Sequence, residues 1–158
     1  MKKNILIVGC MGHIGFSLAK YFSLQKFNVV GFYNNTLDKN KLIQLKQLKV
    51  RLFKNNLSNP KKILNLIKKY KITDCIYASA ISHDSIAKHR PFETLLVNSL
   101  YPDYFIKFVK KKLLKNLFIL VLDQFFKIFN LTKLKLMRIL YRVLNLCTLF
   151  QNELLKFK

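Results

Sequence analysis

Three glycines that directly follow a short apolar run constrain the fold of this chain more than any other feature. Ile5 to Val8 is a run of branched apolar residues, as expected for a strand buried on both faces of a parallel sheet. Gly9, Gly12 and Gly15 follow in the spacing GxxGxxG, and an apolar-periodic helix begins within that spacing. The expected order is therefore strand, glycine turn and helix.

A strand that runs through glycines into a helix creates a binding site for a diphosphate. The bare backbone amides and the positive end of the helix face the anion, and side chains at the glycine positions would block its close approach. Residues 1–122 are therefore expected to form a dinucleotide-binding, Rossmann-like domain that is incomplete, and residues 123–158 an atypical amphipathic helical tail.

Short apolar runs and longer periodic segments alternate along the chain to about residue 112. This alternation is typical of a doubly wound α/β fold, in which right-handed crossovers join parallel strands. Residues 79–91 are expected to form a polar loop that leads into a helix. Pro102 lies within that helix and is expected to kink it or to split it in two. We expect strands at 4–8, 28–32, 50–53, 74–78 and 117–122, in the order 3-2-1-4-5, and helices at 12–25, 38–48, 60–70 and beyond 91.

The chain is strongly basic, with a formal net charge of +22 from 29 Lys and Arg against 7 Asp and Glu. Such a balance is typical of proteins that bind nucleic acid or an anionic membrane. In the sequence, however, the lysines are scattered through every helix rather than gathered in one stripe, and the Lys, Asn, Ile, Leu and Phe content is typical of an AT-rich coding sequence. We therefore interpret the lysines as solvated faces and expect no specific nucleic-acid partner.

The three cysteines, Cys10, Cys75 and Cys147, show neither metal-binding spacing nor a pairing pattern, which indicates reduced thiols in a cytoplasmic protein. Lys2 and Lys3 precede an apolar run of only four residues, so no signal peptide is expected. No run reaches the roughly 18 apolar residues of a membrane span.

Two groups of polar residues fall near the expected ligand-binding edge of the sheet. His13 lies within the glycine turn, where we expect it to pack at the start of the helix rather than to catalyse. His83, Asp84, His89 and Arg90 follow the fourth strand, at the carboxyl edge. His83 and Asp84 are adjacent and lack a supporting cluster, so we predict a loop near a cofactor or substrate and no metal site.

Four segments together resemble one known family over residues 4 to about 112. They are GxxGxxG at 9–15, NNLSNP at 55–60, YASAIS at 77–82 and LLVNS at 95–99. In this order they resemble the extended short-chain dehydrogenase/reductase family, the group of NAD-dependent epimerases, dehydratases and sugar-nucleotide reductases. In that family an Asp at the position of Asn56 contacts adenine, and the Asn matched by Asn98 steadies the catalytic Lys.

The resemblance implies NAD or NADP as coenzyme and a nucleotide-linked sugar as substrate. Tyr33 and Asn34 stand where the family often carries an Asp for the adenosine ribose, so the choice between NAD and NADP is open. The resemblance assigns coenzyme contact to Gly9, Met11, Gly12, His13, Ile14, Gly15, Tyr33, Asn34, Asn56, Leu57, Ala78, Ser79, Ala80 and Asn98.

The catalytic set of that family is missing. The family uses a Ser or Thr after the fifth strand and a Tyr-x-x-x-Lys pair, in which the Lys lowers the pKa of the Tyr for proton exchange with the substrate. None of the seven tyrosines is followed by Lys four residues later. We therefore predict no catalytic residue and an inactive chain as written. The alternative is a non-catalytic nucleotide-binding or interaction protein with a basic tail at a membrane surface.

The composition changes after the lysines at 110–112, and residues 125–158 contain no Gly or Pro. A frame shifted at the lysine codons permits the family's fifth strand with its serine over 117–122. The same frame permits Tyr-x-x-Ser-Lys over 147–152. We therefore interpret the residues beyond the lysine run as out-of-frame translation. A divergent amphipathic helix and a basic membrane-surface segment are the alternatives.

Overall fold

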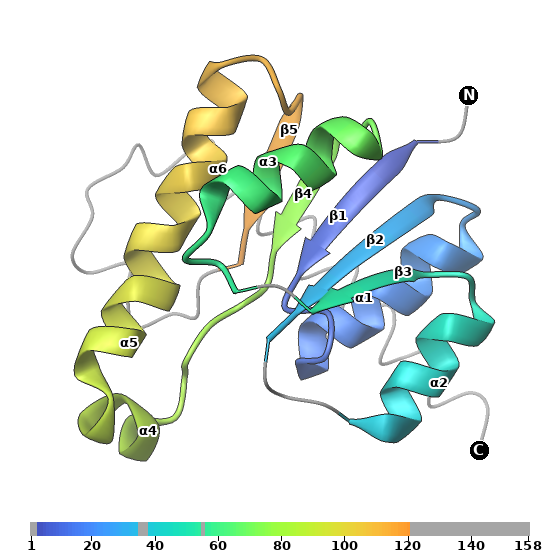
Figure 1. Ribbon diagram of the computed structural model, residues 1–158. Helices are drawn as coiled ribbons and strands as arrows, with labels where there is room; N and C mark the ends of the chain where they lie inside the picture. Colours follow the sequence, from blue (N-terminus) through green and yellow to red (C-terminus); the bar gives the residue numbers. More distant parts are fainter. Residues whose placement is uncertain (1–2, 35–37, 55, 121–158) are drawn as a thin grey trace, which may run out of the picture. The chain divides into compact units, whose positions relative to one another are not determined.

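The computed structural model describes residues 3–34, 38–54 and 56–120, and the structural statements below concern these residues. They form one five-stranded sheet with helices on both faces (Figure 1). All neighbouring strands are parallel and follow the order β3-β2-β1-β4-β5, which confirms the predicted fold class and strand order. The strands are β1 (Asn4–Val8), β2 (Asn28–Tyr33), β3 (Arg51–Lys54), β4 (Asp74–Tyr77) and β5 (Asn116–Ile119).

The central strand β1 is buried on both faces, as its apolar run predicts. Leu6 and Val8 are at most 1% exposed and belong to a core with two helices, α3 (Pro60–Lys69) and α6 (Tyr101–Lys110). This core covers one face of the sheet. Its helix residues include Ile63, Ile67, Phe105 and Phe108.

The alternate side chains of β1 pack on the opposite face. Ile5 and Ile7 are at most 3% exposed and share a second core with α1 (His13–Leu24) and α2 (Lys39–Gln47). Because successive strand side chains point to opposite faces, one four-residue apolar run supplies both cores. The helix residues of the second core include Leu18, Ala19 and Leu45.

Four helices end in the same way, with an exposed lysine in the left-handed region of backbone space. The lysines are Lys26, Lys49, Lys71 and Lys112, with φ between 47° and 63°. Each backbone N–H bonds to the carbonyl three residues earlier, and the next residue bonds to the carbonyl five residues earlier. This arrangement is the Schellman ending, in which glycine is the usual residue.

The helix predicted beyond residue 91 is divided, as Pro102 predicts. It consists of α5 (Pro91–Leu95), a π turn η1 (Leu96–Leu100) and α6. The predicted loop at 79–91 is wrong in part, because it contains the short helix α4 (Asp84–His89). That helix buries no residue, so it leaves no apolar period in the sequence.

Candidate functional site

The glycine turn is held against the carboxyl end of β2. The N–H groups of Gly9 and Cys10 both donate to the carbonyl oxygen of Phe32, at 2.9 and 3.0 Å. The N–H of Gly12 donates to the carbonyl oxygen of Gly9 at 3.0 Å, which closes the turn. The turn is therefore fixed by backbone contacts to a core strand.

Gly9 and Gly15 are required by the packing of the turn itself. Gly9 has a φ of +84°, and a Cβ there would lie 2.9 Å from the carbonyl oxygen of Ala78 and from the backbone of Ser79. A Cβ on Gly15 would collide with the carbonyl oxygen of Gly9. Glycine thus lets the start of α1 and the end of β4 approach the turn closely.

Gly12 occupies a different environment from the other two glycines of the turn. It is exposed, and a Cβ there would meet only the carbonyl oxygen of Gly9, at 3.3 Å. It is also the N-cap of α1 and offers no side chain to the first N–H groups of the helix. Those N–H groups have no carbonyl one turn earlier in the helix, and no acidic residue lies in the first turn. The site is suited to an anionic ligand.

A lysine from α2 reaches the glycine turn. The Nζ of Lys41 donates to the carbonyl oxygen of Met11 at 3.2 Å and lies 3.7 Å from a carboxylate oxygen of Asp38. Asp38 also caps α2 by accepting from the backbone N–H of Lys41 at 3.1 Å. The partly exposed ammonium group of Lys41 therefore lies beside the glycine turn.

The segment after β4 is fastened to the helix that follows it. The side-chain amide of Asn98 accepts from the N–H of Ile81 at 2.9 Å and donates to its carbonyl oxygen at 3.0 Å. Asn98 thus holds the segment that carries Ala78, Ser79 and Ala80. Its predicted contact with the coenzyme stays a prediction.

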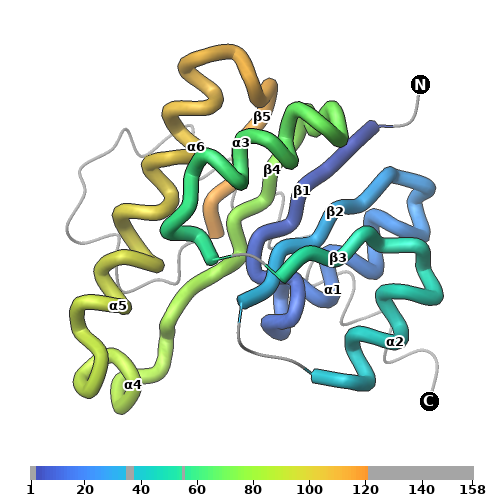
Figure 2. The backbone as a smooth tube through the Cα atoms, in the orientation of Figure 1, coloured from blue at the N-terminus to red at the C-terminus, as the bar shows by residue number. Residues whose placement is uncertain are grey.

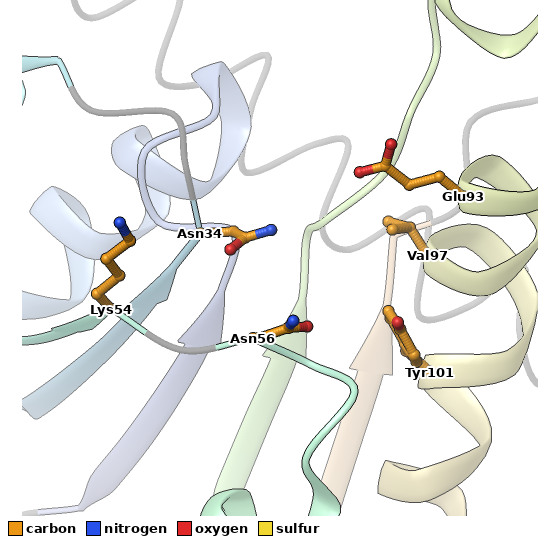
Figure 3. Close-up of a pocket in the computed structure, with 6 residues that line it drawn as sticks. All are labelled: Asn34, Lys54, Asn56, Glu93, Val97 and Tyr101. Carbon is orange, nitrogen blue, oxygen red and sulfur yellow. The ribbon is translucent and has the colours of Figure 1, made fainter. Parts of the chain in front are cut away.

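Beside the carboxyl ends of β2 and β3 lies a cavity of about 430 Å³ (Figure 3). Asn34 and Asn56, both predicted site residues, lie across it from Glu93 and Tyr101. The Oδ1 of Asn56 accepts from the backbone N–H of Ser58 at 3.0 Å, so its Nδ2 group can donate to a ligand. The cavity is lined by Asn34, Lys54, Asn56, Glu93, Val97 and Tyr101.

Sequence reasoning missed four of these lining residues. Glu93, Val97 and Tyr101 reach the cavity because α5, the π turn and the start of α6 lie beside the sheet edge (Figure 3). That placement depends on how the divided helix packs, for which the sequence has no local signal. Lys54 could have been identified, because it is the last residue of a strand that ends at the carboxyl edge.

The other predicted site residues divide into buried and exposed positions. Met11 is 2% and Leu57 is 9% exposed, so their side chains belong to the core. Ile14 is 38% exposed, and Tyr33 is half-buried at the end of β2. His13 is exposed, so the expectation that it packs at the helix start is wrong. The turn ahead of α1 is closed by backbone bonds and needs no aromatic side chain.

The polar residues after β4 lie on or next to the exposed helix α4. His83, Asp84, His89 and Arg90 are all exposed. Arg90 lies 3.5 Å from a carboxylate oxygen of Glu93. Among the described residues no group of three His, Cys, Asp or Glu side chains is placed to hold a metal ion.

Buried titratable groups in the described residues are poorly suited to proton transfer. Burial raises the pKa of the Cys10 thiol to about 12 and also raises the pKa of Cys75. Burial, with a smaller contribution from Tyr101, raises the pKa of Tyr77. Both cysteines are free thiols, as predicted, and Cys147 lies outside the described residues.

No helix within the described ranges is long and apolar enough to cross a bilayer. The tail predicted at 123–158 and its domain boundary fall outside the described residues. Of the segment interpreted as out-of-frame translation, only residues 113–120 are described.

Comparison with known proteins identifies a family and similar folds. The model of the NAD dependent epimerase/dehydratase family matches residues 5–121. No curated protein sequence matches the chain.

Three similar solved structures are epimerases. UDP-glucose-4-epimerase from Stenotrophomonas maltophila, with bound NAD and formylated UDP-arabinopyranose, has a TM-score of 0.67 at 13% identity over 74% of this chain and 36% of that one. The Brucella ovis UDP-glucose 4-epimerase in complex with NAD gives 0.63 at 17%, over 74% and 35%. The Campylobacter jejuni UDP-Glc/GlcNAc 4-epimerase gives 0.67 at 17%, over 74% and 36%. The chain thus matches about a third of the length of these proteins, and at these identities the likeness establishes the fold.

Proposed function

The chain belongs to the NAD dependent epimerase/dehydratase family, and from this premise we propose that its described part is a coenzyme-binding domain for NAD or NADP. The observation that carries the proposal is the start of α1, where Gly12 leaves the first N–H groups of the helix uncovered. A diphosphate needs this combination of amide donors, positive helix end and missing side chain.

The adenosine end of the coenzyme fits the cavity beside β2 and β3. Asn34 and Asn56 line it, and the free Nδ2 of Asn56 can donate to a ring nitrogen. Lys41 adds a positive charge next to the glycine turn. These residues hold and orient the ligand. When bound, such a coenzyme supplies a nicotinamide ring that accepts or donates hydride.

The same residues supply no proton-transfer partner for a substrate. The family's Tyr-x-x-x-Lys pair is missing from the whole sequence. Tyr77, at the end of β4, has its hydroxyl bonded to a backbone carbonyl, and burial raises its pKa. We therefore propose that the chain as written binds coenzyme without turning over a nucleotide-linked sugar. Turnover of a UDP-sugar by the purified chain would contradict this.

Calorimetric titration of the full chain with NAD⁺ and NADP⁺ tests coenzyme binding. Gly12→Ala adds a methyl group at the N-cap of α1, where it would meet only one backbone atom, at 3.3 Å. We expect it to leave the fold intact and to weaken binding by about tenfold or more, since about 1.4 kcal/mol is a factor of ten. Ser17→Ala, one turn further along α1, is the control and should bind as the wild type does. Equal affinities for both variants would refute the site.

The out-of-frame interpretation of the residues after the lysine run has its own test. The nucleotide sequence across codons 110–115 and onward determines whether an open shifted frame encodes Tyr-x-x-x-Lys. We expect that it does. Stop codons in that frame would contradict the interpretation and favour a divergent helix.

A further inference from the structure

Exposed lysines precede every strand of the sheet. Lys3 directly precedes β1, and Lys26 and Lys49 lie two residues before β2 and β3. Lys71 lies three residues before β4, and Lys115 directly precedes β5. In the strand order β3-β2-β1-β4-β5, the edge at which the strands begin reads Lys49, Lys26, Lys3, Lys71 and Lys115.

The topology gathers lysines that are scattered in the sequence. In a parallel sheet all strands begin at one edge, so the helices that precede them end there. Figure 2 shows the turns into β2, β3, β4 and β5 at the same edge as the start of β1. With about 4.8 Å between neighbouring strands, four steps place the five lysines along roughly 19 Å. We call Lys3, Lys26, Lys49, Lys71, Lys112 and Lys115 the basic edge.

Four residues of the basic edge adopt a conformation that lysine rarely takes. Lys26, Lys49, Lys71 and Lys112 have φ values of 63°, 60°, 47° and 56°. Glycine is the usual residue at this point of a helix ending, because a Cβ is unfavourable there. A repeated local cost of this kind directs attention to what the side chains do.

Few opposite charges lie near the basic edge. Of the five carboxylates in the described residues, Asp38, Asp84, Glu93 and Asp103 cap or begin helices, and so lie toward the opposite end of the sheet. Asp74 begins β4 and accepts hydrogen bonds from Thr73 and Asn116. Further exposed lysines in the last turns of the helices add to the positive charge, namely Lys46, Lys68, Lys69 and Lys110.

We propose that the basic edge binds the phosphate backbone of nucleic acid without regard to base sequence. A row of cations separated by a few ångströms suits a linear polymer that carries one charge every few ångströms along each strand. A membrane surface is a poorer fit, because stable attachment needs an apolar anchor in addition to charge. Among the large apolar side chains that are exposed in the described part, only Leu24 lies in the last turn of a helix that ends at this edge. This surface lies at the opposite end of the strands from the proposed coenzyme site, and its function is independent of that site.

The left-handed lysines allow a charge-removal variant that does not weaken the fold. The quadruple variant Lys26→Gly, Lys49→Gly, Lys71→Gly and Lys112→Gly places the preferred residue at each helix ending. The control replaces four exposed lysines at the start of α2, at the start of α3 and in α4 with glutamine, so that both variants lose the same net charge. These substitutions are Lys39→Gln, Lys61→Gln, Lys62→Gln and Lys88→Gln.

The test is fluorescence anisotropy of a labelled oligothymidylate mixed with the full chain at several salt concentrations. We expect the wild type and the control to bind with steep salt dependence. In the glycine variant the slope of log K against log salt should become less steep by about 3. Four phosphate contacts are lost, and each contributes about 0.7 to the slope with single strands. Equal losses in the two variants would overturn the proposal by assigning binding to net charge alone. Absence of binding by the wild type, or binding to phosphatidylserine vesicles but not to the oligonucleotide, would also overturn it.

Discussion

The hydroxyl of Tyr77 donates a hydrogen bond of 2.6 Å to the backbone carbonyl of Val97, which joins the end of β4 to the π turn. Pro102 explains why that carbonyl is free. The N–H of Tyr101 bonds to Leu96, five residues back, instead of to Val97. The next nitrogen belongs to Pro102 and has no hydrogen. A proline in the sequence thus creates an acceptor that a buried tyrosine of the sheet satisfies.

Tyr77→Phe is expected to lower the free energy of unfolding by about 1–2 kcal/mol, because it leaves the Val97 carbonyl without a partner. Chemical denaturation measures the change. Tyr104→Phe removes a hydroxyl from a half-buried ring nearby, and should change stability by less than about 0.5 kcal/mol. Equal effects of the two substitutions would contradict the role assigned to the Tyr77 hydroxyl.

Gly15→Ala is expected to destabilise the fold by about 3 kcal/mol or more. The added Cβ would collide with the carbonyl oxygen of Gly9 and lie 2.8 Å from its carbonyl carbon, and neither atom can move without opening the turn. Thermal unfolding followed by circular dichroism measures the loss. If Gly15→Ala were as stable as Gly12→Ala, α1 would not approach the glycine turn as closely as described.

Lys26→Gly is expected to raise stability by about 1 kcal/mol, because the left-handed conformation costs a residue with a Cβ roughly 1–2 kcal/mol. The same substitution at Lys20, inside α1, should lower stability by about 1 kcal/mol. Denaturant titration of both variants measures the change in the free energy of unfolding and therefore its sign in each. Destabilisation by both would contradict the helix ending described for α1.

Alkaline pH should reveal the burial of Cys10. Its pKa is raised by burial from 9.0 to about 12, so above pH 9 the unfolded chain loses a proton that the folded chain keeps. The contribution of this thiol to the free energy of unfolding is therefore complete below about pH 9 and is lost as pH rises toward 12. Cys10→Ala should make the fall of stability in this window shallower by about 1.4 kcal/mol per pH unit. If the free energy of unfolding fell equally steeply with pH in the variant and the wild type, the Cys10 thiol would be exposed to solvent rather than buried.

The sequence was sufficient to predict the framework because its signals are local or topological. The apolar run ending at Val8 predicts β1 with its observed bounds, and Asn59 with Pro60 predicts the start of α3. The Oδ1 of Asn59 accepts from the N–H of Lys62, as a helix cap does. The strand order is that of the doubly wound dinucleotide-binding fold, which the glycine turn after the first strand indicates.

Features that depend on tertiary contacts were missed. The helix at Asp84–His89 buries nothing and has no apolar period. Glu93 and Tyr101 reach the cavity only because the divided helix packs beside β4 and β5. The gathering of lysines such as Lys49 and Lys71 at one edge becomes visible only when the strand order is known. All of the predicted site residues, those of the glycine turn included, stay predictions until a ligand is bound.

The most direct test of the account is the NMR titration of the ¹⁵N-labelled full chain with NAD⁺ and NADP⁺. If the start of α1 binds the diphosphate, the amide signals of Gly12, His13, Ile14 and Gly15 will shift and saturate with at least one of the two coenzymes. The amide signals of the opposite edge, at Lys26 and Lys71, will stay in place. Saturating shifts elsewhere with unmoved signals at residues 12–15, or no shift with either coenzyme in a folded sample, would contradict the proposed site.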